Sequence, residues 1–368
     1  LRLHHRALPA GLVRGVGDAM RRFDAYQLGK YKSTGQTRNM LRLGRPKPRT
    51  AEERELWGAA VKGGLPIPYT WESELSKATT DDEKRAVWNE LLRTKKLGLF
   101  ALIRNIRNIA QVGADLEEAL EQITRERVVG SGILPFQWYK AWQAVQPLSV
   151  EVAQVFLQAI TWSLEGAEKL PGRTLVACDN SGSMAGGTQT RGLSNLEIAN
   201  LMGAMALTVC EDGIAGTFGD EFALAQTSPA LNLLANKGAI DYCGQSTGSS
   251  TNAWKVFQTL TEARVHVDRV VLLSDMQCYD SATAGFNRAM RGRLAVGYSM
   301  AGELEAYRQA INPNIVVYSI NLTTQDNSSQ FAAEQPVVEL AGFSESIFRF
   351  MAAMEAGESV LDRIRKDY

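Results

Sequence analysis

The sequence predicts a protein of the α + α/β class, with a domain of helical repeats over residues 1–170 and an α/β domain with a parallel sheet over residues 171–368. Two observations predict this division. Before residue 172, apolar residues recur at helical spacing and no stretch has the pattern of a buried strand. After Leu170-Pro171-Gly172, short apolar runs alternate with helical segments, which is typical of a parallel sheet covered on both faces.

The helices of the first half are predicted from apolar spacing and from residues that begin or end helices. Val13 to Lys32 is amphipathic, and the proline-containing stretch Gly44–Thr50 interrupts the pattern. Thr50 is a candidate N-cap, because Glu53 follows three residues later as in a capping box. Further helices are expected over residues 51–61, 81–93, 96–112, 115–124, 135–145 and 149–165. This succession of short helices suggests an α-solenoid of the HEAT type, although the sequence has no clean repeat.

The strands of the second half are predicted from short apolar runs that end at polar residues. They are expected over residues 174–178, 214–218, 269–273 and 314–321, with helices over residues 193–211, 253–260 and 344–356. Polar loops at the carboxyl ends of parallel strands are where ligands bind in such folds. The loops that follow these runs are therefore the first place to look for a functional site.

The composition restricts the class of protein. The 368 residues include 22% charged and 45% hydrophobic residues, which excludes a disordered chain, a collagen and a coiled coil. No apolar run of about 18 residues predicts a membrane span, and the first residues have no apolar signal core, so a cytoplasmic protein is expected. The four cysteines are widely spaced and only three histidines are present, so we expect reduced thiols and no zinc site.

The formal net charge of zero is the sum of a basic half and an acidic half. Residues 1–170 carry 26 Lys or Arg and 19 Asp or Glu, whereas residues 171–368 carry 14 and 21. Residues 1–50 alone hold twelve basic and two acidic residues. A basic surface of this kind attracts polyanions. The alternative interpretation is a set of ordinary solvated helix faces.

Much of the basic excess lies in residues 30–49, which we call the basic segment. Its cations would neutralise phosphates, and the neighbouring Tyr26 and Tyr31 would either stack on unpaired bases or pack in the core. A polar stretch on the helix expected over residues 96–112 adds a second group. The candidate RNA-binding residues are Lys30, Lys32, Arg38, Arg42, Arg45, Lys47, Arg49, Arg104, Asn105 and Arg107. For any single one of them, the alternative is a solvated face.

Hydroxyl and carboxylate side chains gather in three loops of the second half. Asp179-Asn180-Ser181-Gly182-Ser183 directly follows the first strand, Thr251 precedes a helix, and Asp275 follows the third strand. A hard cation such as Mg²⁺ prefers about six oxygen ligands, which hydroxyls and water can supply while carboxylates orient them. We therefore expect a Mg²⁺ site formed by Asp179, Ser181, Ser183, Thr251 and Asp275. The alternative is a loop of the same shape that binds no metal.

These three loops resemble the metal-ion-dependent adhesion site (MIDAS) of von Willebrand factor A domains, whose fold is Rossmann-like. In that family the D-x-S-x-S serines, a Thr and an Asp organise a metal that can take one acidic ligand from a partner. Enzyme motifs are not indicated, since no G-K-[ST] of a P-loop is present and Asn180-Ser181-Gly182 lacks the leading Gly of a hydrolase elbow. His266 is the only His of the second half. We predict no catalytic residues and expect that the protein is not an enzyme.

Three stretches of the first half resemble the TROVE module of the Ro autoantigen family. They are Tyr26–Lys32, Asn39–Pro48 and Leu102–Ile106, and they occur in the family's order ahead of an A domain. The resemblance is to the bacterial type of orthologue. Only about a dozen residues precede the first helix, so we expect a shortened N-terminal part. Family members often place an RNA-contacting His just before Arg38, where this chain has Thr37.

The resemblance implies an RNA-binding scaffold in RNA quality control or degradation. Ro proteins bind small structured noncoding Y RNAs on a basic outer surface and take the 3′ ends of misfolded RNA into the hole of a helical ring. Bacterial members are associated with polynucleotide phosphorylase, an exoribonuclease. We expect RNA as the partner, and neither DNA nor a membrane. The alternative is a protein-binding adaptor whose A domain grips an acidic partner through Mg²⁺, although such an adaptor has no need for the basic charge of residues 1–50.

Overall fold

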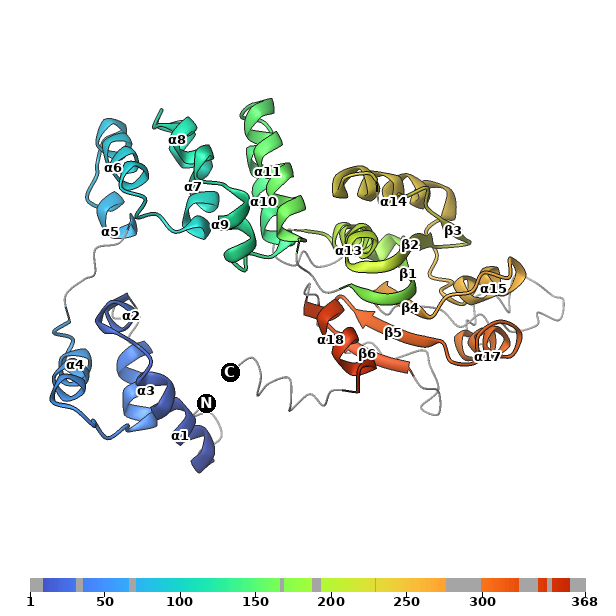
Figure 1. The fold of residues 1–368 in the computed structure, drawn as a ribbon, viewed down its shortest axis with the longest axis horizontal. Coiled ribbons are helices and arrows are strands. Elements are labelled where there is room, and N and C mark those ends of the chain that lie inside the picture. The colour runs from blue at the N-terminus through green and yellow to red at the C-terminus, as the bar shows by residue number, and fades with distance from the viewer. Residues whose placement is uncertain are drawn as a thin grey trace. The chain divides into compact units, whose positions relative to one another are not determined.

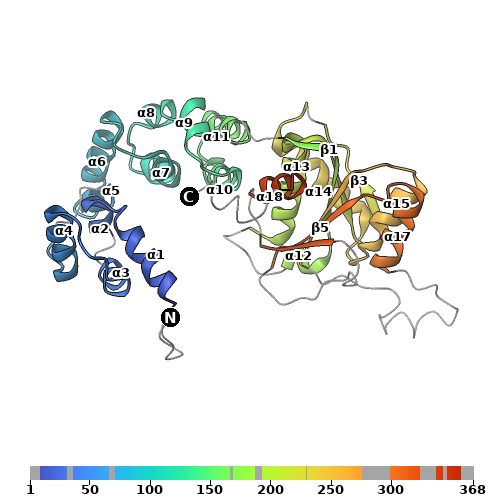
Figure 2. The ribbon, with the colours of Figure 1, turned by 60° about the horizontal axis from the view of Figure 1, so that its bottom comes forward.

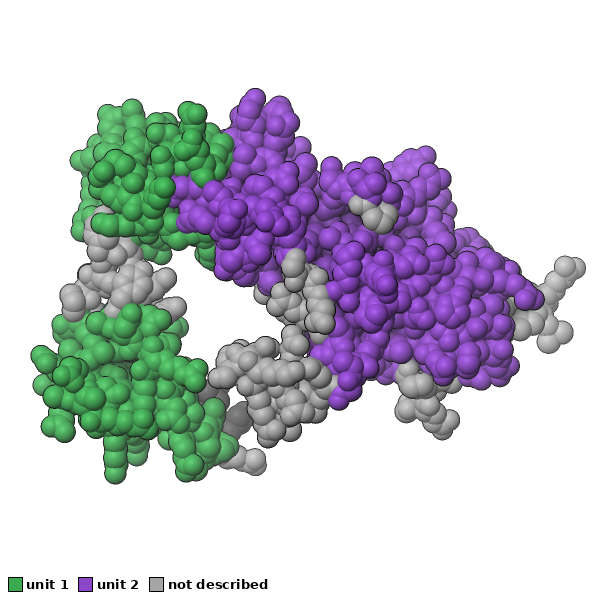
Figure 3. Space-filling model, in the orientation of Figure 1, with its two compact units in different colours: residues 1–121 green, residues 122–368 purple. Residues whose placement is uncertain are grey.

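A computed structural model describes residues 9–30, 36–65, 71–165, 169–186, 193–228, 230–275, 299–323, 337–342 and 346–357. The chain divides into two compact units, Leu1–Glu121 and Gln122–Tyr368, which Figure 3 colours separately. The change from helices to strands falls elsewhere, because the first strand begins at Leu170. The expected boundary at residue 170 coincides with the change from helices to strands. That this point separates two domains stays a prediction.

The described residues of the first unit form helices, which Figure 1 shows as a succession of short rods. They are α1 (Ala10–Met20), α2 (Ala25–Lys30), α3 (Gln36–Gly44), α4 (Ala51–Lys62), α5 (Trp71–Leu75), α6 (Asp81–Arg93), α7 (Leu99–Gln111) and α8 (Leu116–Glu121). The helices expected over residues 51–61, 81–93 and 96–112 are confirmed, whereas α3 and α5 were not expected. In the described part of the chain, no helix has the length and apolar character needed to cross a membrane.

The single helix expected over residues 13–32 is wrong, because α1 and α2 are separated by a turn at residues 21–24. Asp24 explains the break. Its backbone N–H donates to the side-chain oxygen of Gln27 (3.0 Å), and its carboxylate accepts from the Gln27 N–H (2.7 Å). Such reciprocal bonds begin a new helix and compete with continuation of the previous one. The apolar periodicity hides the break, since Met20 and Leu28 are buried in the same core.

The helices α1 to α4 share one core, and α1 and α3 cross closely. The buried residues of this core are Met20, Leu28, Leu41, Trp57, Ala60 and Leu65. At the crossing, a Cβ on Gly44 would lie 2.7 Å from the backbone nitrogen of Gly17 and 2.9 Å from its Cα. Those contacts are with backbone, which cannot move aside as a flexible side chain would. The close approach of the two helices therefore requires glycine at position 44.

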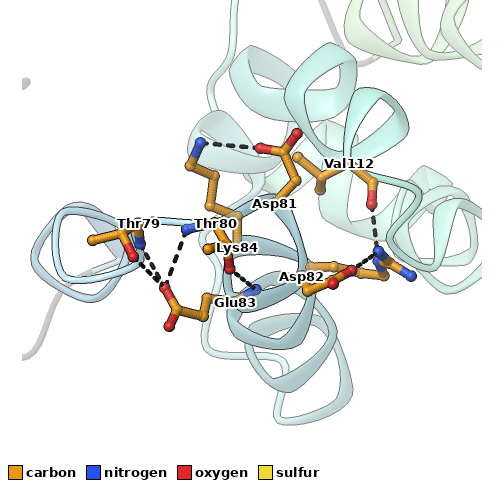
Figure 4. A network of polar contacts seen from close by, with 8 residues as sticks. Thr79, Thr80, Asp81, Asp82, Glu83, Lys84 and Val112 are labelled. Carbon is orange, nitrogen blue, oxygen red and sulfur yellow. Dashed lines mark hydrogen bonds and ion pairs between the residues drawn. The ribbon is translucent and has the colours of Figure 1, made fainter.

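The start of α6 is stabilised by a capping box, drawn in Figure 4. The Thr80 hydroxyl accepts from the Glu83 N–H (3.2 Å), and the Glu83 carboxylate accepts from the N–H groups of Thr79 (2.6 Å) and Thr80 (3.1 Å). The bond from the Thr79 N–H is the main reason that the pKa of Glu83 is lowered. Arg85, in the first turns of the same helix, donates to the carbonyl of Val112 (3.0 Å), just after α7. This bond ties the start of α6 to the end of α7.

The second unit begins with three helices and continues into a sheet. The helices α9 (Arg125–Gly130), α10 (Pro135–Val145) and α11 (Val150–Ser163) confirm the helices expected over residues 135–145 and 149–165. The strands are β1 (Leu170–Asp179), β2 (Cys210–Phe218), β3 (Phe222–Leu224), β4 (Arg269–Ser274), β5 (Val316–Asn321) and β6 (Val337–Ala341). The remaining helices are α12 (Gly182–Gly186), α13 (Asn195–Val209), α14 (Leu233–Thr247), α15 (Trp254–Glu262), α17 (Met300–Ala310) and α18 (Ser346–Glu355).

The six strands are ordered β3-β2-β1-β4-β5-β6, and all neighbours are parallel except β2 and β3. The chain passes outward from β1 to β2 and β3 and then returns to β4 on the other side of β1, so the order reverses between β1 and β4. In open parallel sheets, ligands bind at such a reversal, outside the carboxyl ends of the strands. Asp179 ends β1 and Asp275 follows β4, which places both at this point.

Helices cover both faces of the sheet, which explains why its central strands are apolar without alternation. Leu175, Val270 and Val317 pack with Phe257 and Tyr307 of the two helices α15 and α17, which lie side by side in Figure 2. On the opposite face, the Cys178 thiol donates to the carbonyl of Ala199 in α13 (3.2 Å). The expected α + α/β class, with a mostly parallel sheet of the von Willebrand factor A type, is confirmed.

An ion pair between a buried arginine and a partly exposed glutamate attaches α18 to the sheet. Arg269, the first residue of β4, pairs with Glu355 at the end of α18 (2.7 Å from Nε to Oε1). The same guanidinium donates to the Pro171 carbonyl (2.9 Å) and the Thr174 hydroxyl (2.7 Å), and Tyr318 donates to Glu355 (2.9 Å). The Arg269 side chain is only 3% exposed. Removing one member of such a largely buried pair is strongly destabilising, because the other charge stays without its partner.

Arg269→Met is expected to lower the free energy of unfolding by about 3 kcal/mol, since it leaves the Glu355 carboxylate unpaired. Urea unfolding followed by circular dichroism measures the change. Arg173→Met is the control, because the Arg173–Asp212 pair is 44% and 49% exposed and its loss should cost less than about 1 kcal/mol. Equal effects of the two substitutions would contradict the role given to the Arg269–Glu355 pair.

Candidate functional site

The first part of the site is the end of β1, where Asp179 is completely buried. One oxygen of its carboxylate accepts from the Ser181 N–H (2.8 Å) and the other from the hydroxyl of Ser274 (2.5 Å), the last residue of β4. The carboxylate therefore bridges the two strands between which the strand order reverses. Burial raises the pKa of Asp179 to about 6, even though these hydrogen bonds favour the charged form.

Ser181 and Ser183 supply hydroxyl groups directly after this carboxylate. Their Oγ atoms are 3.1 Å apart, with Ser181 buried and Ser183 partly exposed. The N–H of Gly182, between them, donates to the carbonyl of Ser249 (3.2 Å). This bond holds the loop that contains Thr251 against the D-x-S-x-S loop.

Thr251 and Asp275 complete the predicted set, and both are buried, with exposed fractions of 4% and 1%. Burial is the main cause of the raised pKa of Asp179, and the charge of Asp275 raises it further. Hydrogen bonds from Gly182 to Ser249 and from Ser274 to Asp179 join the three loops at one edge of the sheet. The structure thus brings together the loops on which the metal-site prediction depends.

The oxygen atoms at this edge fit a small, hard divalent cation. Two buried carboxylates repel each other, and a cation beside them would relieve that repulsion. Mg²⁺ commonly binds through one or two carboxylates and keeps several waters, and three hydroxyls would add neutral ligands. Within the described residues, no group of three or more His, Cys, Asp or Glu side chains could hold a metal. A cation at this edge would therefore be held mainly by hydroxyls and water.

The described part of the basic segment lies on α3 and on the loop between α3 and α4. Its exposed cations are Arg38, Arg42, Arg45, Lys47 and Arg49. None of these five side chains forms an ion pair with another described residue. Arg38 and Arg42 are one helical turn apart on α3, so they share a face. The Lys30 side chain and the whole of Lys32 lie outside the described residues.

Arg21 holds the loop of the basic segment in place, although the sequence did not single it out. Its guanidinium donates to the carbonyl of Lys47 (2.6 Å) and to the carboxylate of Glu53 (3.0 and 3.2 Å), and it lies 5.3 Å from the ring centroid of Trp57. The Arg49 N–H donates to the same carboxylate (2.6 Å). A paired, half-buried arginine therefore fixes the backbone from which the exposed cations project.

The second predicted group lies on α7, where Arg104 and Arg107 are exposed. The Arg104 guanidinium is 5.5 Å from the ring centroid of Phe100, which is itself 43% exposed. Sequence reasoning missed Phe100, although an aromatic residue one turn before an arginine on a polar face was a signal for it. Asn105 is buried, and its amide donates to the carbonyl of Ala101 (2.9 Å). Because the Asn105 side chain is buried and bonded within its own helix, it is not part of the RNA-binding surface proposed below.

Thr37 is also buried, and its hydroxyl donates to the carbonyl of Leu28 (3.1 Å). This bond joins the start of α3 to the end of α2. Thr37 stands near the position where the resemblance to the Ro family implies an RNA-contacting His, and in this chain its side chain stabilises the local fold.

Most of the helical part of the chain is similar to a known family of domains. The family model described as the TROVE domain matches residues 58–209, from α4 to the end of α13. Residues 58–209 are thus similar to a TROVE domain. This matched region includes Arg104, Arg107 and the D-x-S-x-S loop, whereas the basic segment precedes it.

The fold is similar to that of a Ro protein over most of the chain. The crystal structure of the Ro (RSR) protein of Deinococcus radiodurans is similar with a TM-score of 0.63 and 20% identity, and the match covers 94% of this chain and 77% of that one. Telomerase protein component 1 of Mus musculus is 33% identical over 89 residues, which are 23% of this chain and 3% of that protein. The chain thus spans a small fraction of this curated relative. Together with the TROVE domain, these findings confirm the predicted resemblance to the Ro family.

The raised pKa of Asp179 predicts how the stability of the metal-free protein depends on pH. Between the ordinary value of 3.8 and about 6, the folded state holds a proton that the unfolded state lacks. The free energy of unfolding should therefore fall as pH rises through this range, by about 3 kcal/mol from this one group. Urea unfolding in the presence of EDTA at several pH values measures the effect. Asp179→Asn should remove this contribution, and identical pH profiles of the two proteins would contradict it.

Proposed function

We propose that this chain is an RNA-binding scaffold that takes small structured noncoding RNA on the exposed cations of the basic segment and of α7. The observation that carries the proposal is that Arg38, Arg42, Arg45, Lys47 and Arg49 are exposed and form no ion pair with other described residues. Exposed cations on a helix and on a fixed loop, without an ion-pair partner among the described residues, can neutralise phosphates. The TROVE domain and the resemblance to the Ro family support the same function.

Each element of this surface would contribute differently to RNA binding. Arg38 and Arg42 would contact phosphates and release counterions, which gives affinity without reading sequence. On α7, the exposed pair of Phe100 and Arg104 offers a flat aromatic and guanidinium surface on which an unpaired base can stack. The combination suits an RNA with both a helical stem and an unpaired loop or end.

The resemblance to the Ro family supports a finer proposal. We propose that the RNA belongs to the Y RNA class, and that the scaffold presents it, or the 3′ ends of misfolded RNA, to an exoribonuclease such as polynucleotide phosphorylase. Its role in RNA quality control is then to bind and position RNA, while the partner supplies the chemistry. We propose no enzymatic activity for the chain itself.

We also propose that the three loops at the carboxyl edge of the sheet bind Mg²⁺. Ser181, Ser183 and Thr251 would supply hydroxyl ligands, while Asp179 and Asp275 would orient them and balance the charge. When bound, Mg²⁺ supplies an electrophilic position that can accept an acidic group of a partner. The burial of both carboxylates and the raised pKa of Asp179 support this proposal.

Charge reversal on α3 is expected to weaken RNA binding and to reduce its dependence on salt. For the parent protein we expect the logarithm of the association constant to fall with the logarithm of salt concentration with a slope of several units. Arg38→Glu with Arg42→Glu should make that slope shallower by about two units, since each phosphate contact contributes roughly one. Fluorescence anisotropy with a labelled Y RNA over a KCl series measures both quantities.

The control for this experiment is Arg93→Glu, because Arg93 is exposed on α6 but paired with Glu90 (2.8 Å). It should leave the salt slope close to that of the parent. Equal slopes for the parent and the α3 variant would contradict the assigned surface. Failure of the parent to bind at low salt with Mg²⁺ present would contradict RNA binding altogether.

Metal binding is expected to stabilise the parent protein against heat. A ligand that binds only the folded state at about 100 times its Kd adds about 2.7 kcal/mol of stability. Thermal unfolding with MgCl₂ and with EDTA should show this gain in the parent, and Asp179→Ala or Ser181→Ala should lose most of it. Ser163→Ala is the control, since its hydroxyl donates to the Ile160 carbonyl within α11 (2.7 Å). A parent protein whose Tm does not respond to Mg²⁺ would argue against the site.

A further inference from the structure

Asn180 connects the D-x-S-x-S loop to two neighbouring elements. Its side-chain amide donates to the carbonyl of Gly244 (2.7 Å), in the last turn of α14, and to that of Gly248 (2.9 Å), directly after the helix. Its backbone N–H donates to the carbonyl of Phe218 (2.9 Å), the last residue of β2. Asn180 thus donates three hydrogen bonds, and each acceptor is at least 38 positions away from it in the sequence.

This connection depends on glycine at both accepting positions. A Cβ on Gly244 would lie 2.9 Å from the Cγ of Asn180 and closer still to its side-chain oxygen. Gly248 has a φ of +79°, in the left-handed region that favours glycine, and a Cβ there would collide with the carboxylate of Asp220. The Gly244 carbonyl can approach the Asn180 amide because residue 244 has no side chain, and glycine at position 248 allows the backbone conformation that presents the second carbonyl.

The same contacts determine where Thr251 lies. Gly248 precedes Thr251 by three residues, and Ser249 between them accepts from the Gly182 N–H (3.2 Å). On the other side, the Asn252 N–H donates to the carbonyl of Gly219 (3.0 Å). The Thr251 loop is therefore held from both ends, and Asn180 holds the end nearer to α14.

We propose that Asn180 is a positioning residue of the candidate metal site and couples that site to the last turn of α14. This inference rests on the metal-binding part of the proposed function. Asn180 acts through the carbonyls of Gly244 and Gly248, which place the Thr251 hydroxyl relative to the hydroxyls of Ser181 and Ser183. Because such coupling is reciprocal, a cation that orders the loops also restrains the end of α14.

The chemistry of the amide makes the proposal specific. An Asp at position 180 has almost the shape of Asn but no donor, so its carboxylate would face two carbonyl oxygens. N180D should therefore lose both hydrogen bonds to the carbonyls of Gly244 and Gly248 and add repulsion between the oxygens. N180A should lose the same two hydrogen bonds without the repulsion. Second-shell partners of metal ligands commonly change metal affinity by about 10–100-fold when they are replaced. We expect a loss of Mg²⁺ affinity in that range for both variants.

The test is Mg²⁺ binding to the folded full chain, measured by isothermal titration calorimetry. N180D and N180A should bind Mg²⁺ about 10–100-fold more weakly than the parent. Ser246→Ala is the matched control, since this hydroxyl donates to the Cys243 carbonyl (2.8 Å) in the same turn of α14. It should leave the affinity unchanged. Gly244→Ala places a methyl group against the Asn180 side chain and should weaken Mg²⁺ binding in the same way. It tests the proposal even if the proteins altered at position 180 do not fold.

Hydrogen exchange distinguishes this coupling from a role in stability alone, because only coupling makes exchange at the end of α14 depend on Mg²⁺. In the parent and in S246A, Mg²⁺ should slow amide exchange in residues 244–248, whereas in N180D it should not. Position-180 or position-244 variants that bind Mg²⁺ as tightly as the parent would overturn the coupling and leave the metal site standing. A parent protein that binds no Mg²⁺ would overturn the metal site, and the coupling with it.

Discussion

The buried carboxylate of Asp179 is the constraint on which the sheet edge depends. Burying a carboxylate is costly unless hydrogen bonds satisfy it, and here one donor comes from the loop after β1 and the other from the neighbouring strand β4. The Ser274 hydroxyl can reach Asp179 only if β4 lies directly beside β1 in the observed register. The Ser181 N–H can reach it only if the chain turns sharply after β1. One polar group therefore specifies both the neighbour of β1 and the path of the loop that follows.

The same cost is the reason for treating this edge of the sheet as a candidate functional site. A hydrophobic residue at position 179 would fit the apolar run of β1 and would avoid the desolvation that raises the pKa of the Asp179 carboxyl. Asp275 adds a second buried carboxylate close by, which increases the cost. Neither group contributes to the core as an apolar residue would. Their presence together at the reversal of strand order is what favours a cation-binding role over a structural one.

How far the sequence predicts this structure depends on whether the signal is local. The capping residues Thr50 and Glu53 are three positions apart, and Thr50 caps α4 as expected. Central strands were found because both of their faces are buried. The edge strand β3 has only three residues, and β6 is half exposed with Glu339 in its middle, so neither has an apolar run. The role of Asn180 was out of reach, since its partners are 64 and 68 residues away.

The region that matches the TROVE model contains only part of the sheet. It ends at Val209 and so contains β1 and the D-x-S-x-S loop, while the loops of Thr251 and Asp275 lie beyond it. The loops of the candidate metal site thus lie on both sides of the end of the matched region, joined by contacts from Ser274 to Asp179 and from Gly182 to Ser249. Strand β1 therefore lies inside the matched region and β2 to β6 lie beyond it, and the polar contacts at the carboxyl edge join β1 to the rest of the sheet. Binding a cation at that edge would strengthen the same junction, which links the metal to the integrity of the fold as well as to a partner.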